Sequence, residues 1–318
     1  MVFLVFKNYK IRDHLITISR RIVQIFAFLL INYVILEVIF SINLVGLENI
    51  LKVLPILNSP RNPLSEGAGI LEYIFYSIAN GLFPFFLIGL LLVILLFSNR
   101  FFCGWICPIG AIQDLLTIIP LKKKMLKTKW HKTLSNVKYV IIVILIIFIL
   151  PLGVSKVTNY AFYFDFYNQL GLFAQKPVGF FSLSEYLFVF LPNLVRDIFL
   201  TGSLDPLFSD LFVFLIFLVF LIIIILSIRY PRFYCRYICP FAAVSSVVTD
   251  YSFVKLSRNP VKCVGRSDCG ICERVCPKQI RILDEPFEFF TGRGECNLCL
   301  KCKEECPYDA ITLKFGSV

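Results

Sequence analysis

Long apolar runs make up most of the chain before residue 230, and short polar segments separate them. A helix needs about 20 apolar residues to cross the ~30 Å hydrocarbon core of a bilayer. Four runs approach or exceed this length, at residues 22–44, 71–97, 139–152 and 211–228. The third is short as written, so we expect its helix to begin inside the amphipathic stretch before it. The pattern therefore predicts four transmembrane helices.

Lysine and arginine are concentrated in alternate loops. They are abundant before the first run, between the second and third runs, and after the fourth, and they are sparse in the two opposite loops. Because cytoplasmic flanks carry the excess of these residues, we expect an integral protein of the cell membrane with both termini in the cytoplasm. No A-x-A-like cleavage site follows the first run, so we interpret this run as an anchor.

The outer segment, residues 153–210, is long for a loop and contains a further apolar piece at residues 186–200. Pro192 interrupts this piece, which also carries Arg196 and Asp197. We expect an interfacial or re-entrant helix here. A fifth span is the weaker alternative because it would break the charge pattern.

The chain contains an internal repeat. Residues 100–112 read RFFCGWICPIGAI and residues 232–244 read RFYCRYICPFAAV, so that seven of thirteen positions match at an offset of 132. Each copy follows an even-numbered run. The unit is therefore two spans plus a C-x3-C-P turn, used twice in the same orientation, and this symmetry predicts that the two turns meet at one membrane depth.

Four cysteines lie in these turns, and we name them the turn cysteines: Cys103, Cys107, Cys235 and Cys239. The two members of each pair are four residues apart, so each pair shares one face of a helical turn. Pro108 and Pro240 suit the first position of a new helix, whose amide end favours negative charge. Three interpretations stay open: a shared third [4Fe–4S] cluster, a redox dithiol pair, and cysteines that are only buried apolar residues.

The C-terminal segment carries eight more cysteines in two series, each ending in Cys-Pro. The second series is C-x2-C-x2-C-x3-C-P, and the first differs by three extra residues in its first gap. This is the run of two-cluster ferredoxins, in which the fourth cysteine of each series ligates the other cluster. We name the predicted ligand groups the first set (Cys263, Cys269, Cys272 and Cys306) and the second set (Cys276, Cys296, Cys299 and Cys302). Zinc also uses C-x2-C spacing, but the tandem runs favour two [4Fe–4S] clusters.

Composition excludes several other classes of protein. The twelve cysteines follow cluster spacing and not a disulfide framework, and His14 and His131 are too few for a haem cytochrome. The net charge of +11 comes largely from the ends of apolar runs, so it indicates membrane orientation and no nucleic-acid partner. No catalytic nucleophile, acid–base dyad or nucleotide loop is visible, so no catalytic residues are expected.

The doubled C-x3-C-P turns after membrane helices, followed by a two-cluster ferredoxin run, resemble the NapH-type membrane ferredoxins of the NapH/NosR/CcoG polyferredoxin group. The resemblance extends from the first span to Pro307. It implies an all-α bundle of four transmembrane helices in two parallel repeats, with a C-terminal α+β ferredoxin-like domain. The expected divisions are a flank (1–21), a first repeat (22–136), a second repeat (137–254) and the ferredoxin-like domain (255–318).

The resemblance also implies a function. It implies electron transfer between the quinone pool and redox partner proteins, such as a soluble ferredoxin-like protein or a reductase. The alternatives are a copper reductase or assembly factor for another metalloenzyme, and a membrane anchor whose clusters are structural. Glu37, Glu72 and Asn80 lie at membrane depth, where ionisable groups are often functional. Glu37 could accept a quinol proton, although snorkelling to the outer surface is the simpler account.

Overall fold

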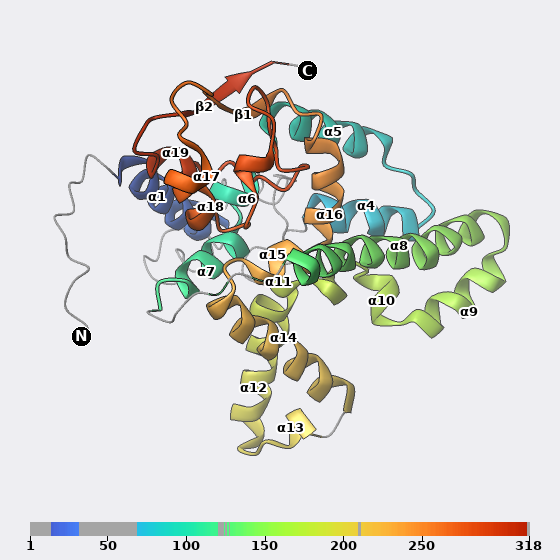
Figure 1. The fold of residues 1–318 in the computed structure, drawn as a ribbon. Helices are drawn as coiled ribbons and strands as arrows, with labels where there is room; N and C mark the ends of the chain where they lie inside the picture. Colours follow the sequence, from blue (N-terminus) through green and yellow to red (C-terminus); the bar gives the residue numbers. More distant parts are fainter. Residues whose placement is uncertain are drawn as a thin grey trace.

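The computed structural model describes residues 14–31, 69–119, 124, 126, 128–208 and 211–316. Its described part is mostly helical (Figure 1). Helix α1 (Leu15–Ile31) covers the start of the first apolar run. The remainder of that run, including Glu37, lies outside the described residues.

Among the described residues, two helices are long and apolar enough to cross a membrane: α8 (Thr128–Thr158) and α14 (Leu211–Arg229). Only 33% of the most apolar 18-residue stretch of α8, and 17% of that of α14, is buried inside the protein. Apolar surface of this extent is unfavourable in water and suits a lipid environment. The chain is therefore a membrane protein, and α8 begins ahead of its apolar run, as predicted.

The second apolar run differs from its prediction. It forms two helices, α4 (Ile70–Ala79) and α5 (Phe85–Ser98), and the chain folds back between them (Figure 1). Gly81 adopts a φ of +73°, and Pro84 has no amide hydrogen to continue a helical ladder. A Cβ on Gly153 of α8 would lie 2.1 Å from the Ile78 carbonyl oxygen, so α8 packs directly on the end of α4. The prediction of one continuous span over residues 71–97 is therefore wrong at its centre.

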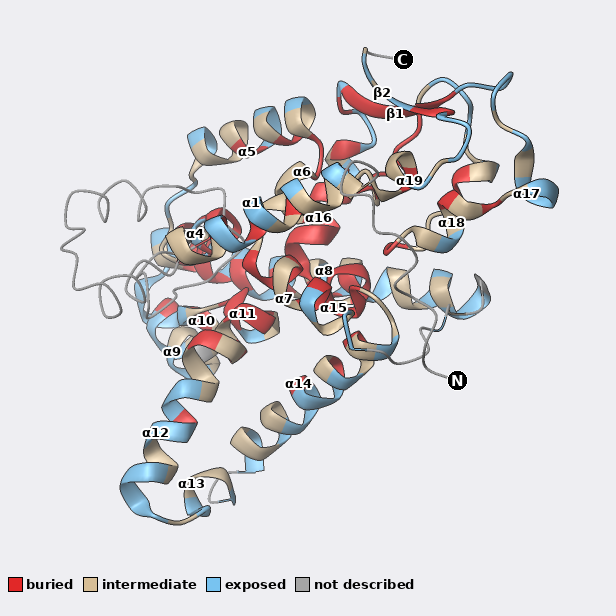
Figure 2. Ribbon diagram, turned by 90° about the vertical axis from the view of Figure 1, so that its left-hand side faces the viewer, coloured by how far each residue is buried: buried red, intermediate tan, exposed pale blue. Residues whose placement is uncertain are grey.

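The predicted helix at residues 186–200 is present within a longer helical stretch. It comprises α11 (Leu183–Glu185), a π-helical turn η3 (Tyr186–Phe190) and α12 (Leu191–Thr201). Pro192 lacks the amide that an α-helical ladder requires, which accounts for the wider turn before it. Helices α12 and α14 project together from the rest of the chain, joined at their far end by α13 (Asp205–Phe208) (Figures 1 and 2). Before α11, the chain forms α9 (Tyr160–Leu170), α10 (Leu172–Gln175) and the 3-10 turn η2 (Gly179–Phe181).

The two C-x3-C-P turns have the same backbone structure. Each is a short helix followed by a longer one: α6 (Phe101–Trp105) with α7 (Pro108–Leu116), and α15 (Phe233–Tyr237) with α16 (Pro240–Thr249). The second cysteine has φ/ψ of −58°/121° in Cys107 and −56°/117° in Cys239. Its amide donates to the carbonyl five residues earlier, at 2.8 Å and 3.0 Å. The helices begin at the two prolines, as predicted.

The C-terminal domain is α+β and is itself built from two similar halves. Strand β1 (Val254–Arg258) pairs antiparallel with β2 (Ile311–Phe315), with Leu256 opposite Leu313. Gly270 and Leu300, thirty residues apart, both precede a short helix with φ near +60°. The extra residues of the first cysteine series form α17 (Gly265–Asp268). The remaining elements are α18 (Ile271–Val275), the 3-10 turn η4 (Ile282–Asp284) and α19 (Lys301–Glu304).

A buried carboxylate joins the two repeats. Asp114 of α7 accepts hydrogen bonds from Nε and Nη2 of Arg232 at 2.8 Å and 2.7 Å. Arg20 and Arg21 of α1 lie 3.7 Å and 3.6 Å from it, and Gln24 donates at 3.1 Å. Buried residues gather in this region, where α1, α7 and α15 meet, whereas α12 and α13 are largely exposed (Figure 2).

Replacing Asp114 with asparagine should destabilise the protein by about 3–5 kcal/mol, because it leaves buried arginines without a counter-charge. Thermal unfolding of the purified protein measures the change. The control is Asp197→Asn, which breaks an exposed ion pair with Arg196 and should cost less than about 1 kcal/mol. Equal melting of the two variants would contradict the role given to Asp114.

Candidate functional site

The first set of cysteines surrounds one small cavity in the C-terminal domain. Its lining includes all four members together with Pro307 and Arg258. The sulfur of Cys306 accepts from the Ala310 amide at 3.4 Å, and Nη1 of Arg258 lies 3.8 Å from the sulfur of Cys263. Such donors favour negative charge on sulfur. These cysteines are far apart in the sequence, and the structure brings them together.

The second set lines a separate small cavity. All four of its cysteines contribute, and the other walls are mainly apolar, among them Leu256, Ile280 and Phe290. Burial raises the pKa of Cys276 to about 11 and that of Cys296 to about 12. Thiols in such surroundings stay protonated unless bound metal stabilises the thiolate. Leu298 and Leu300 have φ of +46° and +57°, a left-handed conformation that side chains adopt at a cost and that functional loops often retain.

The turn cysteines meet between the two repeats. The thiol of Cys107 lies within electrostatic range of the other three, and burial raises its pKa and that of Cys235. Gln113 of α7 donates to the sulfur of Cys235 at 3.0 Å. From the second repeat, Arg232 donates to the carbonyl oxygen of Cys103 in the first turn at 3.2 Å. The two turns are therefore in contact, as the repeat predicted.

Buried cations surround the turn cysteines. Arg100 is 1% exposed and lies within electrostatic range of Cys103 and Cys239. Lys278, which is 3% exposed, donates to the carbonyl of Cys235 at 2.9 Å. Buried charges require compensation. Glu295 supplies it for Arg100, and thiolates or an anionic group at the turn cysteines would supply it for Lys278.

Unpartnered donors give an independent test of whether a cluster fits. The Nε and Nη2 atoms of Arg100 are buried and have no hydrogen-bond partner, as are Nε and Nη1 of Arg236. Both arginines lie within electrostatic range of predicted ligand cysteines. The inorganic sulfides of an iron–sulfur cluster are hydrogen-bond acceptors that such donors suit. Within the described residues, no three His, Cys, Asp or Glu side chains are arranged to hold a single metal ion.

The second set lies next to the turn cysteines. The indole of Trp105 donates to the Leu298 carbonyl at 2.9 Å, and Nη1 of Arg100 donates to the Gly294 carbonyl at 2.9 Å. Two glycines allow this approach. A Cβ on Gly104 would lie 2.3 Å from the Asn297 oxygen, and one on Gly294 would lie 1.8 Å from the Ser246 oxygen. The loop that carries the second set is therefore pressed against both repeats.

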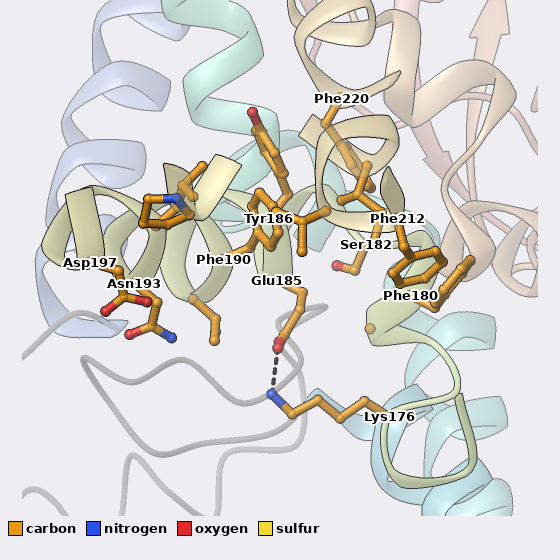
Figure 3. A pocket seen from close by; sticks show the side chains of 16 residues that line it. Lys176, Phe180, Ser182, Glu185, Tyr186, Phe190, Asn193, Asp197, Phe212 and Phe220 are labelled. Atoms are coloured by element: carbon orange, nitrogen blue, oxygen red, sulfur yellow. Dashed lines mark hydrogen bonds and ion pairs between the residues drawn. The ribbon is translucent and has the colours of Figure 1, made fainter. Parts of the chain in front are cut away.

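A pocket of about 340 Å³ lies between α12 and α14, on the other side of the turn cysteines from the C-terminal domain. Tyr186 stacks on Phe220 with ring centroids 4.8 Å apart, and Lys176 pairs with Glu185 at the polar end of the pocket (Figure 3). Ser182 lines the pocket and lies beside the hydroxyl of Tyr234.

Tyr234 connects this pocket to the turns. Its hydroxyl donates to the Phe181 carbonyl at 3.0 Å, and its backbone carbonyl accepts from the Cys239 amide. Glu72, one of the acidic residues singled out from the sequence, accepts from the Gly179 amide at 2.8 Å, and its second carboxylate oxygen has no hydrogen-bond partner. The side-chain oxygen of Asn80 accepts a hydrogen bond from Lys156 at 3.1 Å. Asn80 is not among the residues that line the pocket.

Sequence reasoning missed several residues of the site. Arg100 and Arg232 contributed only to the Lys/Arg counts that predict membrane orientation. In the structure, both are buried against the turn cysteines. No sequence pattern indicated Gln113, which donates to Cys235, or the pairing of Lys138 and Arg100 with Glu295. The repeat offers one signal that could have found the arginines, because each stands at the same position before its turn.

Comparison with known proteins agrees with this site. The family model of a 4Fe-4S binding domain matches residues 80–130 and 212–259, the two segments that contain the turn cysteines. A ferredoxin of Methanothermococcus thermolithotrophicus is 32% identical over 53 residues, which are 17% of this chain and 87% of that protein. No solved structure matches. The chain is thus an iron–sulfur protein of the ferredoxin type.

Two relatives match most of the chain. YccM of Escherichia coli, assigned provisionally to electron transport, is 29% identical over 76% of this chain and 59% of its own length. The ferredoxin-type protein NapH of Escherichia coli is 21% identical over 74% of this chain and 71% of its own length. Through these relatives, the chain is similar to the NapH/NosR-type group of membrane ferredoxin-type proteins.

Replacing Gly104 with alanine should destabilise the protein by about 1–3 kcal/mol, because the added methyl group must displace the Asn297 backbone. Thermal unfolding and protease sensitivity of the C-terminal domain measure the effect. Gly89→Ala is the matched control, since nothing lies within 4 Å of its Cβ position in α5. A Gly104 variant as stable and as protease-resistant as the Gly89 variant would show that the close approach is absent.

Proposed function

We propose that this protein carries electrons between the quinone pool and a partner redox protein through three iron–sulfur centres. The observation that carries the proposal is the gathering of all twelve cysteines into three groups of four, of which the second set and the turn cysteines are direct neighbours. The provisional assignment of YccM to electron transport and the ferredoxin-type name of NapH support the same conclusion.

In this proposal, the first and second sets each hold one [4Fe–4S] cluster, which supplies reversible one-electron transfer when bound. The chain's own residues hold and insulate these sites. Leu256, Ile280 and Phe290 exclude water from the second set, and Arg258 places positive charge beside Cys263. Both effects tune the potential of an iron–sulfur site.

The turn cysteines are proposed to hold a third cluster. Lys278 is nearly inaccessible to water and lies beside Cys235, whereas the charges of Arg100 and Arg232 are already paired with Glu295 and Asp114. An anionic centre at the turn cysteines would compensate the charge of Lys278, which a neutral dithiol pair or plain burial would not do. The match of both turn segments to a 4Fe-4S binding family is further support.

The pocket between α12 and α14 is proposed to receive a quinone. Its aromatic walls suit a flat ring, its apolar length suits an isoprenoid tail, and the Lys176–Glu185 pair offers polar groups at one end. Tyr234 lies between Ser182 of the pocket and the Cys235–Cys239 turn. We further propose that the termini and the C-terminal domain face the cytoplasm, on the Lys/Arg distribution of the flanks.

Anaerobically purified protein should contain about twelve irons per chain, from the ligand count of three cubanes. Cys103→Ser or Cys239→Ser should remove one cluster signal from the paramagnetic resonance spectrum and leave the two ferredoxin signals. Cys302→Ser should instead alter a ferredoxin signal. An iron content near eight that the turn substitutions do not change would contradict the third cluster.

Filling the pocket should slow reduction of the clusters by a quinol analogue. Ile216→Trp places a bulky ring in the pocket and should lower this rate about tenfold or more, whereas reduction by dithionite stays unchanged. Leu218→Trp is the control, because Leu218 lies on the same helix outside the pocket lining. Equal quinol rates in the two variants would exclude this pocket. Reduction of Cu(II) in place of reaction with quinol would favour the metal-reductase alternative.

A further inference from the structure

A second large concavity lies beside the first set and the second C-x3-C-P turn. It is a groove of about 920 Å³, formed where the start of α8 and helix α15 meet the C-terminal domain. His131 and Lys132 of α8 form one wall, and residues 278–281 and 292–295 form the other. Neither the sequence patterns nor the proposed quinone pocket accounts for it.

The groove carries an excess of positive charge. Its basic residues are Lys132, Arg236, Arg266, Arg274, Lys278, Arg281 and Arg293. Its acidic residues are Glu273, Asp284, Glu285 and Glu295. Several of the acidic groups are already neutralised: Arg266 pairs with Glu273 at 2.9 Å and with Asp284 at 2.7 Å. Arg100 and Lys138, which lie outside the groove, bind Glu295.

The remaining positive charge lies next to the first set of cysteines and the second C-x3-C-P turn. Cys269 of the first set lines the groove, and Arg274 donates to its carbonyl oxygen at 2.8 Å. At the floor, Lys278 donates to the Cys235 carbonyl at 2.9 Å. An electron acceptor or donor seated in the groove would therefore be close to the first set.

The sequence next to the groove is also rich in lysine. The sequence that leads into α8 and forms its first turn reads KKKMLKTKWHK over residues 122–132, and of this stretch Leu126, His131 and Lys132 line the groove. Gln279 accepts from the Leu126 amide at 3.4 Å and from Nη2 of Arg236, so this segment is tied to the C-terminal domain. Arg274 and Arg293 are exposed at the groove and available to a partner.

We propose that this groove docks the acidic face of a soluble electron-carrier protein, which exchanges one electron with the first set. The inference rests on the proposed function, since only an electron-transfer protein needs such a partner. Complementary charge raises association rates and orients two redox proteins without requiring tight binding. An anionic lipid headgroup shares the charge chemistry, but it carries no electron to the cysteines that line the groove.

The experiment uses the full-length, cluster-loaded protein in detergent, reduced with dithionite, and an acidic two-[4Fe–4S] ferredoxin as the probe. Stopped-flow absorbance should show electron transfer whose second-order rate falls as ionic strength rises. The double variant Arg274→Glu/Arg293→Glu should lower that rate at low salt about tenfold or more. Lys314→Glu, an exposed charge on β2 outside the groove, should transfer electrons at the original rate.

Two further measurements separate the outcomes. Reoxidation by a small neutral acceptor should be the same in all variants, and its absence in the original protein would contradict the proposed function as well as the docking. A ferredoxin rate that is insensitive to salt and to the double variant would overturn the docking alone. Loss of binding to phosphatidylglycerol vesicles in the double variant, with an unchanged ferredoxin rate, would assign the groove to lipid and also overturn it.

Discussion

The ion pair of Asp114 with Arg232 is the constraint on which the arrangement of the cysteine turns depends. Both groups are almost fully buried, so their desolvation must be offset by close contacts. The arginine cluster holds the pKa of Asp114 well below its usual range. Since the folded-state pKa is depressed, the stability that Asp114 contributes is present above about pH 4. It is lost only as the pH falls toward the depressed value. The same guanidinium binds the Cys103 and Gly104 carbonyls and so fixes the first turn against the second.

The repeat is symmetric in its backbone and asymmetric in its charges. Arg100 occupies in the first copy the position of Arg232 in the second, but Ser246 stands where Asp114 stands in the first. With no carboxylate at that position of the second repeat, Arg100 binds Glu295 and the Gly294 carbonyl of the C-terminal domain. One duplicated arginine thus joins the repeats, and the other joins the repeats to the ferredoxin domain.

Local chemistry explains which features the sequence could predict. Cysteine spacing, the Cys-Pro steps and the 132-residue offset specify backbone turns directly, so the turns and the α+β domain were predictable. For the second run, Pro84 predicts a kink within one span, but the fold-back between α4 and α5 was not predictable, because the apolar run is nearly continuous. Lysine and arginine counts assume exposed side chains. Arg232 and Lys138 are fully buried, so their structural role could be found only from tertiary contacts.

Burial and fixed charge act in opposite directions on the turn cysteines. Burial raises the pKa of Cys107 and Cys235, which disfavours negative charge there, whereas Arg232 and Lys278 favour it at Cys235. A centre that gains an electron gains negative charge, so nearby cations stabilise its reduced state while the apolar surroundings oppose that reduction. Lys278 belongs to the C-terminal domain and contacts the second turn. The docking of that domain therefore contributes to the electrostatics of the turn cysteines, in addition to bringing the second set next to them.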